Sequence, residues 1–351
     1  MMALNLALKE RPCLDDAVAV TPYGGKGGFP LFVQPSDPRL RDEPDAARDW
    51  FDRNRELVEA MLLDAGAVVF RGFAVRTTHE FSNLMGAYYE PRRLGYAGGA
   101  AARAQLADQV YETSKSGPAA VITMHQEMMY DPAPPSRICF FCHVPSVSGG
   151  ETFLGDMREV TAALPVKLVE AADKRGVRYQ RNYRDPGSFT GNSYLDMVLH
   201  RDWQSAFSTT DRDQAIETCR AMELEARFLP DGSLSTSYTG PGLADHPVTG
   251  ERFWFNGLAT NTMRPQTIGA ENYAALVECY GDKRPVPYLT TFGDGEPASP
   301  EDLEALDSVL DRLKVAFPWS SGDMLLIDNY RTAHGRNWFT GLRDIQVALF
   351  Q

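Results

Sequence analysis

The sequence has few cysteines and no long apolar run, which argues against a secreted or membrane-spanning protein. Its 351 residues include only 5 Cys, and their irregular spacing suggests no disulfide framework, as is usual in a reducing compartment. No stretch reaches the roughly 20 apolar residues that a membrane span requires. The first residues, MMALNLALKERPCLDDA, become charged too soon for a secretory signal. We therefore expect a cytoplasmic protein with no membrane partner.

Basic residues are also scarce. The chain has 35 Lys and Arg against 47 Asp and Glu, which gives a formal net charge of -12. An acidic surface repels phosphate backbones, so we expect no nucleic acid partner. Glycine-rich turns occur, but none has the spacing of a dinucleotide-binding or P-loop motif, which argues against a nucleotide-binding α/β fold. No internal repeat or charge block marks a domain boundary, so we expect residues 1–351 to form a single domain.

Short strand-like segments separated by turn signals dominate the chain from residue 121 onward. Apolar residues at helical spacing are confined to a few segments. This mixture predicts a mainly β protein with flanking helices, built as a closed or double-sheet architecture. Strands are expected near residues 67–73, 121–130, 136–144, 149–156, 177–183, 250–256, 322–330 and 343–350, a hairpin at 223–239, and helices at 45–66, 166–175, 209–222 and 300–314.

Two stretches have no sustained apolar period and are rich in small or polar residues. They cover residues 90–120 and 185–205. Long irregular segments inside a domain often close over a binding site, so we expect both to act as lid loops.

Cys139 and Cys142 form a CxxC pair, a spacing that is common in metal sites. Both, however, lie in the strand-like segment 136–144. Residues three apart on a strand face opposite sides of the sheet, so the two thiols could not bind one ion. We expect two ordinary buried cysteines.

One short motif suggests a metal site elsewhere. His125 and Glu127 stand two apart in the strand-like VITMHQEMMY, and residues i and i+2 of a strand point to the same face. With a second histidine from a distant strand, they would form a set of two His and one carboxylate. Such a set leaves three positions open on an octahedral metal, the arrangement of non-haem Fe(II) oxygenases. Taken alone, a strand histidine is more often a buried core residue.

His334 is the best candidate for the third ligand. It closely follows a strand-like segment, in an expected turn with Gly335 behind it. His143 also follows a strand, but Pro145 comes soon after. The remaining histidines occur in polar or turn contexts and are interpreted as surface residues: His79, His200 and His246.

Two further residues point to a carboxylate-binding site. The turn at Gly149 and Gly150 lets Thr152 present its hydroxyl at the start of a strand. Arg343 enters the last strand, and a planar guanidinium is the natural bidentate partner of a carboxylate. If Arg343 faced the interior its charge would need a partner, which a diacid cosubstrate would supply. The plainer interpretations are an ordinary strand residue for Thr152 and a surface arginine for Arg343.

Together these segments resemble the taurine dioxygenase-like family of Fe(II)- and 2-oxoglutarate-dependent oxygenases. The resemblance runs from about residue 64 and is greatest to members that hydroxylate amino acids in natural-product pathways, the syringomycin-type hydroxylases. The matching segments are DAGAVVFRGF, HQEMMYDPAPPSRICFFCHVPSVSGGETFLGDMREV, HPVTGERFWFN, FGDGEP and FPWSSGDMLLIDNYRTAHGRNWFTGLRDIQVALF.

The resemblance implies a fold, an activity and a set of site residues. The fold would be a double-stranded β-helix, the jelly roll of cupin-like proteins, and the cofactors Fe(II), 2-oxoglutarate and O2. His125, Glu127 and His334 match the iron ligands. Thr152 and Arg343 match the pair that holds the distal carboxylate of 2-oxoglutarate. The substrate would be a small amino-acid-like molecule, free or presented on a carrier protein.

Departures from the family pattern narrow the chemistry. Related halogenases have a small residue at the position of Glu127, so Glu127 favours hydroxylation, epoxidation or desaturation. Some members carry a second arginine where Val347 stands, so a sulfonate substrate is not expected. Arg92, Arg93 and Lys115 of the first lid loop are candidates for holding a substrate carboxylate. Two other functions stay open: a Zn-dependent hydrolase or lyase on the same triad, and a non-catalytic β-barrel that binds a small ligand or carrier.

Overall fold

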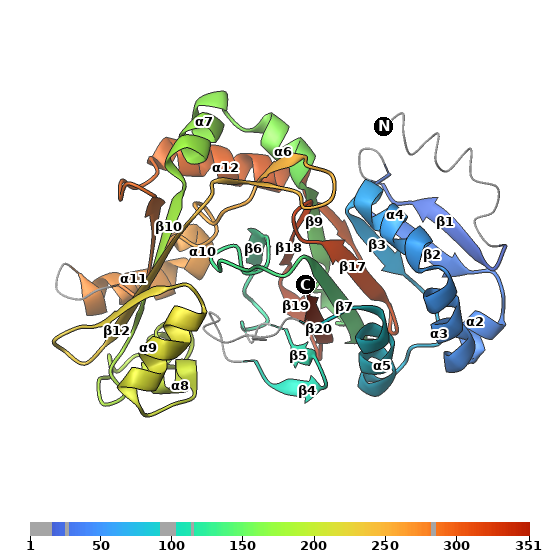
Figure 1. The fold of residues 1–351 in the computed structure, drawn as a ribbon, viewed down its shortest axis with the longest axis horizontal. Helices are drawn as coiled ribbons and strands as arrows, with labels where there is room; N and C mark the ends of the chain where they lie inside the picture. The colour runs from blue at the N-terminus through green and yellow to red at the C-terminus, as the bar shows by residue number, and fades with distance from the viewer. Residues whose placement is uncertain (1–15, 25–27, 92–102, 114–115, 282–285) are drawn as a thin grey trace.

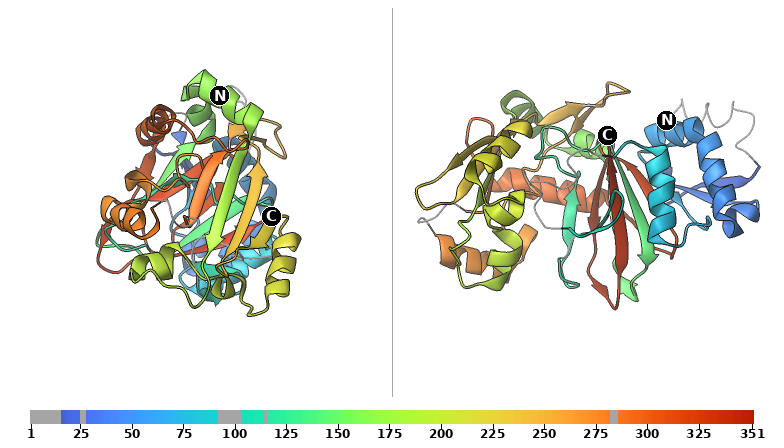
Figure 2. Two further views of the ribbon diagram at one scale, coloured as in Figure 1. Left: turned by 90° about the vertical axis from the view of Figure 1, so that its left-hand side faces the viewer. Right: turned by 60° about the horizontal axis from the view of Figure 1, so that its bottom comes forward.

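A computed structural model describes residues 16–24, 28–91, 103–113, 116–281 and 286–351. Two sheets packed face to face lie near its centre, with helices on their outer faces, and a third sheet extends to one side (Figure 1). Figure 2 shows the same layers from two further directions. The mainly β, double-sheet architecture expected from the sequence is confirmed.

The larger sheet has eight strands in the order β1-β2-β3-β17-β7-β20-β5-β4. Its neighbouring strands are antiparallel except for β2 and β3, which run parallel. The central strands are almost wholly buried because both of their faces are covered. The strands are β1 (Val18–Pro22), β2 (Leu31–Pro35), β3 (Ala67–Phe70), β4 (Gln105–Ala107), β5 (Val110–Glu112), β7 (Arg137–Val144), β17 (Met324–Asp328) and β20 (Asp344–Phe350).

A four-stranded antiparallel sheet in the order β16-β9-β18-β6 packs over the larger sheet. Phe140 and Leu325 of the larger sheet meet Leu154 and Phe317 of the smaller one in a shared apolar core. This core sets the distance between the two sheets. The strands are β6 (Ile122–His125), β9 (Thr152–Asp156), β16 (Val315–Phe317) and β18 (Thr332–Arg336).

Helices cover the outer faces of both sheets (Figure 1). On the larger sheet, Trp50, Phe51 and Phe81 pack with Phe70 and Phe141. On the smaller sheet, apolar residues of α6, α7 and α12 form a second cluster. The helices are α2 (Arg39–Asp42), α3 (Pro44–Arg53), α4 (Arg55–Ala65), α5 (Thr78–Tyr88), α6 (Met157–Ala163), α7 (Val166–Arg175) and α12 (Pro300–Leu313).

The third sheet has the strand order β11-β12-β10-β15 and forms the expected hairpin between β11 and β12. Its strands are β10 (Val177–Tyr183), β11 (Glu225–Phe228), β12 (Leu234–Gly240) and β15 (Tyr288–Phe292). Near it lie a π-helical turn, η2 (Leu195–Leu199), and helices α8 (Trp203–Phe207), α9 (Arg212–Ala221), α10 (Pro265–Ile268) and α11 (Ala270–Tyr280). Two small ribbons pair β13 (Leu243–Asp245) with β14 (Arg252–Trp254), and β8 (Ser148–Gly149) with β19 (Phe339–Thr340).

The single helix expected over 45–66 is two helices, because the chain breaks at Asn54. Its side-chain amide donates to the Trp50 carbonyl oxygen over 2.9 Å, and its own φ and ψ of -105° and 18° leave the helical region. Such local bonding by Asn competes with the helix ladder. The expected end at Gly66 is confirmed, with a left-handed φ of 80°.

The two stretches interpreted as loops contain regular structure. Within 90–120, β4 and β5 form a short hairpin that adds to the edge of the larger sheet, paired through β5 to β20. Strands of three residues are too short to produce an apolar period. Within 185–205, η2 and the start of α8 replace the expected irregular chain.

The structure bears on the expectations about the CxxC pair and about membrane-spanning segments. Cys139 packs under the helices and Cys142 packs between the two sheets, so the thiols face opposite sides of β7 as expected. Across the described ranges, none of the helices has the length and apolar character needed to cross a membrane.

Candidate functional site

Two histidines face each other across neighbouring strands of the smaller sheet. His125 is the last residue of β6 and stands opposite His334 in the antiparallel register with β18. Their ring centroids are 4.6 Å apart. Gly335 permits this close approach, because a Cβ there would lie 2.5 Å from the Ile122 carbonyl oxygen and 2.1 Å from the Phe153 ring. The strand pair therefore brings the two imidazoles side by side.

His334 lies inside β18, so its expected place in a turn is wrong. The turn comes earlier, over residues 329–331, directly after β17. The strand TAHGR is wholly buried but contains only one aliphatic side chain, Ala333. It therefore produces no apolar period that the sequence could reveal.

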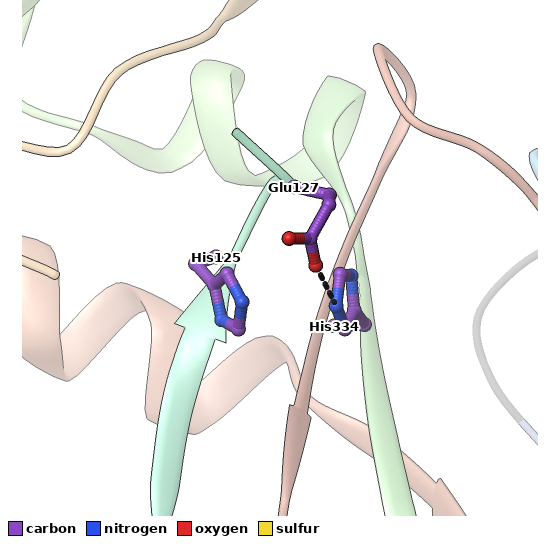
Figure 3. Close-up of side chains that lie close together, drawn as sticks. All are labelled: His125, Glu127 and His334. Carbon is purple, nitrogen blue, oxygen red and sulfur yellow. Dashed lines mark ion pairs between the residues drawn. The ribbon is translucent and has the colours of Figure 1, made fainter. Parts of the chain in front are cut away.

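Glu127 follows the end of β6, so strand alternation is not what aims its carboxylate at the histidines. The chain turns directly after it, where Met128 has a left-handed φ of 54°. Glu127 Oε2 nonetheless lies 3.5 Å from His334 Nε2 (Figure 3). One candidate ligand atom from each of His125, Glu127 and His334 lies within 4.8 Å of the other two. The structure thus brings the three residues together by a different route from the expected one.

The surroundings set the tautomer and charge of two of these residues. His125 Nδ1 lies 2.8 Å from the Thr123 carbonyl oxygen, so it carries the proton and Nε2 keeps its lone pair. Burial lowers the pKa of His125 to about 4. Burial alone would raise the pKa of Glu127, but Arg103 and the nearby His334 outweigh it and hold that pKa at about 2. At neutral pH His125 is therefore neutral and Glu127 ionised, the forms that bind a cation.

Arg103 is a site residue that sequence reasoning missed. One of its guanidinium nitrogens lies 3.6 Å from Glu127 Oε1, and its side chain is mostly buried. Arginines in a segment without an apolar period give no signal of which one faces the site. The three cations named from the sequence, Arg92, Arg93 and Lys115, lie outside the described residues.

Thr152 and Arg343 both lie by the turn at Gly149 and Gly150. Thr152 begins β9, and its buried hydroxyl oxygen accepts a hydrogen bond of 3.1 Å from the Trp319 indole. Arg343 stands just before β20 and donates from Nε to the Gly150 carbonyl oxygen over 3.1 Å. In the described part of the chain no hydrogen bond joins Thr152 to Arg343 directly. The glycine turn brings the two residues to the same end of the sandwich.

The charge of Arg343 has no carboxylate within ion-pair distance among the described residues. Burial lowers the pKa of this guanidinium to about 10, and the nearby Arg336 cation adds to the effect. Arg336 itself, also missed from the sequence, donates to the carbonyl oxygens of Ser116, Gly117 and Ala120. Even partial burial makes a cation without a counter-charge costly unless an anion joins it. Arg343 is thus suited to bind a carboxylate.

Two of the three histidines interpreted as surface residues are buried, which corrects that reading. His246 Nε2 donates to Asp328 over 2.8 Å, while its Nδ1 accepts from two backbone amides. His200 Nδ1 bonds the Tyr280 hydroxyl, and burial lowers the pKa of His200 to about 4. Their turn contexts gave no hint that other segments pack over them. His79 is exposed, as expected.

Comparison with known proteins adds an independent line of evidence. Residues 33–349 match the family described as taurine catabolism dioxygenase TauD, TfdA family. The chain is 29% identical over 309 residues to the dapdiamide synthesis protein DdaC of Enterobacter agglomerans, covering 87% of this chain and 88% of that protein. It is 28% identical over 303 residues to a clavaminate synthase-like protein of Arabidopsis thaliana, covering 84% of each.

Solved structures are similar in fold. The PvcB protein of Pseudomonas aeruginosa superposes with a TM-score of 0.52 at 15% identity, covering 97% of this chain and 94% of that one. AAD-2 in complex with Mn(II) and N-oxalylglycine gives a TM-score of 0.51 at 14% identity, covering 95% and 96%. At such identities the likeness concerns the fold alone, and it confirms the double-stranded β-helix.

The family match covers most of the chain, including the whole smaller sheet and the larger sheet from β2 onward. It agrees with the fold that the sequence and the structure had already pointed to. The enzymes of this family use Fe(II), 2-oxoglutarate and O2. The chain therefore belongs to the TauD/TfdA family of Fe(II)- and 2-oxoglutarate-dependent dioxygenases.

Proposed function

We propose that His125, Glu127 and His334 are the ligands of the catalytic Fe(II). The observation that carries this proposal is the convergence of one nitrogen or oxygen atom from each residue to within 4.8 Å of the others. Two imidazoles and one carboxylate are a donor set that suits Fe(II) and leaves coordination positions open. The neutral state of His125 and the ionised state of Glu127 at neutral pH fit the same role.

Thr152 and Arg343 are proposed to hold the distal carboxylate of 2-oxoglutarate. Arg343 supplies a partly buried charge that an anion would offset, and its guanidinium can bind both carboxylate oxygens. Thr152 already accepts a hydrogen bond from Trp319, so its hydroxyl hydrogen is available to donate to the cosubstrate. An uncharged donor and a cation beside one turn form a suitable carboxylate site.

Bound at these residues, Fe(II) would supply O2 activation, in which 2-oxoglutarate loses CO2 and takes one oxygen atom to become succinate, while the other oxygen oxidises the substrate. Glu127 as the carboxylate ligand favours hydroxylation, with epoxidation or desaturation as the related outcomes, over halogenation. The chain's own part is to orient the two histidines and the carboxylate and to keep the centre buried. Phe140 contributes by packing against His334, with a distance of 5.0 Å between the two ring centroids.

The substrate is proposed to be derived from an amino acid, free or tethered to a carrier protein, in a cytoplasmic natural-product pathway. Support comes from DdaC, a relative named for dapdiamide synthesis. Arg103 places a cation beside Glu127, where it could meet a substrate carboxylate. The lid roles of residues 90–120 and 185–205 remain part of this proposal.

The metal ligands can be tested by substitution. His125→Ala or Glu127→Ala should abolish Fe(II) binding and substrate-dependent succinate production, whereas the exposed His79→Ala should leave both unchanged. Fe(II) binding is measured by anaerobic titration, and succinate release is screened with amino acids and their carrier-bound thioesters. Unaltered turnover by either variant would refute the ligand assignment. Turnover with Zn²⁺ and no O2 uptake would instead identify a hydrolase or lyase on the same residues.

A further inference from the structure

The side chain of Asn329 is fully buried and bonds to both backbone polar groups of Glu127, the N–H and the carbonyl oxygen. Its amide oxygen accepts from the Glu127 N–H over 2.8 Å. Its amide nitrogen donates to the Glu127 carbonyl oxygen over 2.9 Å and to the Pro135 carbonyl oxygen over 2.8 Å. All four polar contacts of the residue are internal, because its own N–H also donates to the Ser136 carbonyl oxygen over 3.1 Å.

These contacts replace strand pairing at the point where it stops. Residues opposite each other in an antiparallel ladder can exchange two hydrogen bonds, one through each N–H. Glu127 lies past the end of β6 and has no such strand partner within the described ladders. The Asn329 amide supplies the same pair of bonds from a side chain. The left-handed Met128 that follows shows how sharply the chain departs from the strand.

Asn329 also links the Glu127 backbone to the turn that precedes the strand of His334. It occupies the turn between β17 and β18, and β18 carries His334. A second bond reaches the same turn, because the Gln126 side chain donates to the Tyr330 carbonyl oxygen over 3.0 Å. The third bond of Asn329, to Pro135, fixes which end of its amide carries the nitrogen. The orientation of the Glu127 backbone is thus set from the turn that leads into the strand bearing His334.

We infer that Asn329 is a positioning residue for the metal centre. It holds the Glu127 backbone in the one orientation that aims the carboxylate at His125 and His334, and it contacts no ligand atom itself. The inference rests on the proposed role of Glu127 as an iron ligand. Partners of this kind typically change metal affinity by about 10- to 100-fold when they are removed.

The experiment compares Asn329→Ala with a matched control, Asn256→Ala. Asn256 is also buried, donates to the Gly242 carbonyl oxygen over 2.7 Å and accepts from the Leu258 N–H over 3.1 Å. Both variants should lower the unfolding temperature. Only Asn329→Ala should weaken Fe(II) binding by about 10- to 100-fold, reduce the visible absorption of the Fe(II)–2-oxoglutarate complex, and release succinate in excess of product.

A further variant separates positioning from packing. In Asn329→Asp the side chain keeps its size and one acceptor oxygen, but a second acceptor oxygen replaces the nitrogen that donates to the Glu127 and Pro135 carbonyl oxygens. This variant should therefore lose Fe(II) affinity without leaving a cavity. If Asn329→Ala does not fold, the Asp variant carries the test.

The outcomes are distinguishable. Folded Asn329 variants that keep the wild-type Fe(II) affinity, and that release no succinate in excess of product, would overturn the positioning role. The assignment of the three metal ligands would be unaffected. An equal loss of Fe(II) affinity in Asn256→Ala would also overturn it, because general destabilisation would then explain both. Unchanged Fe(II) binding by Glu127→Ala alone would overturn the ligand assignment, and the positioning role with it.

Discussion

Among single residues, Arg336 and Arg343 have different roles although both guanidiniums are shielded from solvent, Arg336 fully and Arg343 in part. Arg336 donates to three backbone carbonyl oxygens and so anchors residues 116–120 against β18. Arg343 makes a single such bond and has burial acting against its charge. An arginine that makes several bonds to the backbone is held as a structural residue, whereas one that makes a single such bond has more donors available to a ligand.

Removal of Arg343 should therefore affect the cosubstrate specifically. In Arg343→Ala the apparent affinity for 2-oxoglutarate should fall about 10- to 100-fold, because a charge-assisted pair is worth roughly 1.5–3 kcal/mol. The affinity of Arg343→Lys for 2-oxoglutarate should lie between those of the wild type and Arg343→Ala, since lysine keeps the charge but loses the planar guanidinium. The measurement is KM for 2-oxoglutarate by succinate release, with the half-exposed Arg48→Ala as control. An unchanged KM would exclude Arg343 from this role.

Between elements, the spacing of β6, β9 and β18 decides whether the two imidazoles meet. β18 lies between the other two strands, and a Cβ at Gly335 would meet atoms of both neighbours, Ile122 of β6 and Phe153 of β9. Its φ is not in the left-handed region, so glycine is needed here for space and not for backbone conformation. A side chain would collide with strand neighbours on both sides of β18.

Gly335→Ala should separate β18 from its neighbours and displace His334 from His125. We expect the free energy of unfolding to fall by roughly 1–3 kcal/mol, as for other overpacked cores, and Fe(II) binding to weaken. Denaturant unfolding and anaerobic Fe(II) titration measure the two effects. Gly24→Ala, where a Cβ would meet nothing within 4 Å, is the control. Wild-type Fe(II) affinity in Gly335→Ala would show that Fe(II) binding does not depend on the spacing between β18 and its neighbours.

At the scale of the whole molecule, the residues proposed to bind Fe(II) and 2-oxoglutarate come from both sheets of the sandwich. His125 and His334 belong to the smaller sheet, whereas Arg343 stands just before β20 of the larger one. A metal ion with its chelating cosubstrate would therefore join the two sheets. Binding of this kind stabilises the folded state, because the unfolded chain has no preformed site.

Fe(II) and 2-oxoglutarate together should thus raise the unfolding temperature under anaerobic conditions, and a chelator should reverse the rise. Ligand at 100 times its dissociation constant adds about 2.7 kcal/mol to the stability of the folded state. Scanning calorimetry measures the shift, and His334→Ala should show almost none. A rise of equal size in that variant would mean that the ligands stabilise the protein at another place.

Much of this architecture could be predicted from local patterns. Alternation along 136–144 predicted that Cys139 and Cys142 face opposite layers, and they do. Helical spacing predicted α12, and the turn at 230–232 predicted the β11–β12 hairpin. Residue types in order along the chain also named the three candidate metal ligands. Such features depend on neighbours a few residues away, which a sequence displays directly.

Only the tertiary structure decided how these residues meet. The contact between Glu127 and Asn329 spans 202 positions of sequence, and that between His246 and Asp328 spans 82. No period or motif encodes such pairs, because they follow from strand register, which the packing of both sheets sets collectively. The amino-acid sequence by itself determined which chemical groups are present and which local elements carry them. Their convergence, burial and charge state came from the packing of distant strands and turns. This packing excludes solvent and determines which groups form hydrogen bonds and ion pairs with one another.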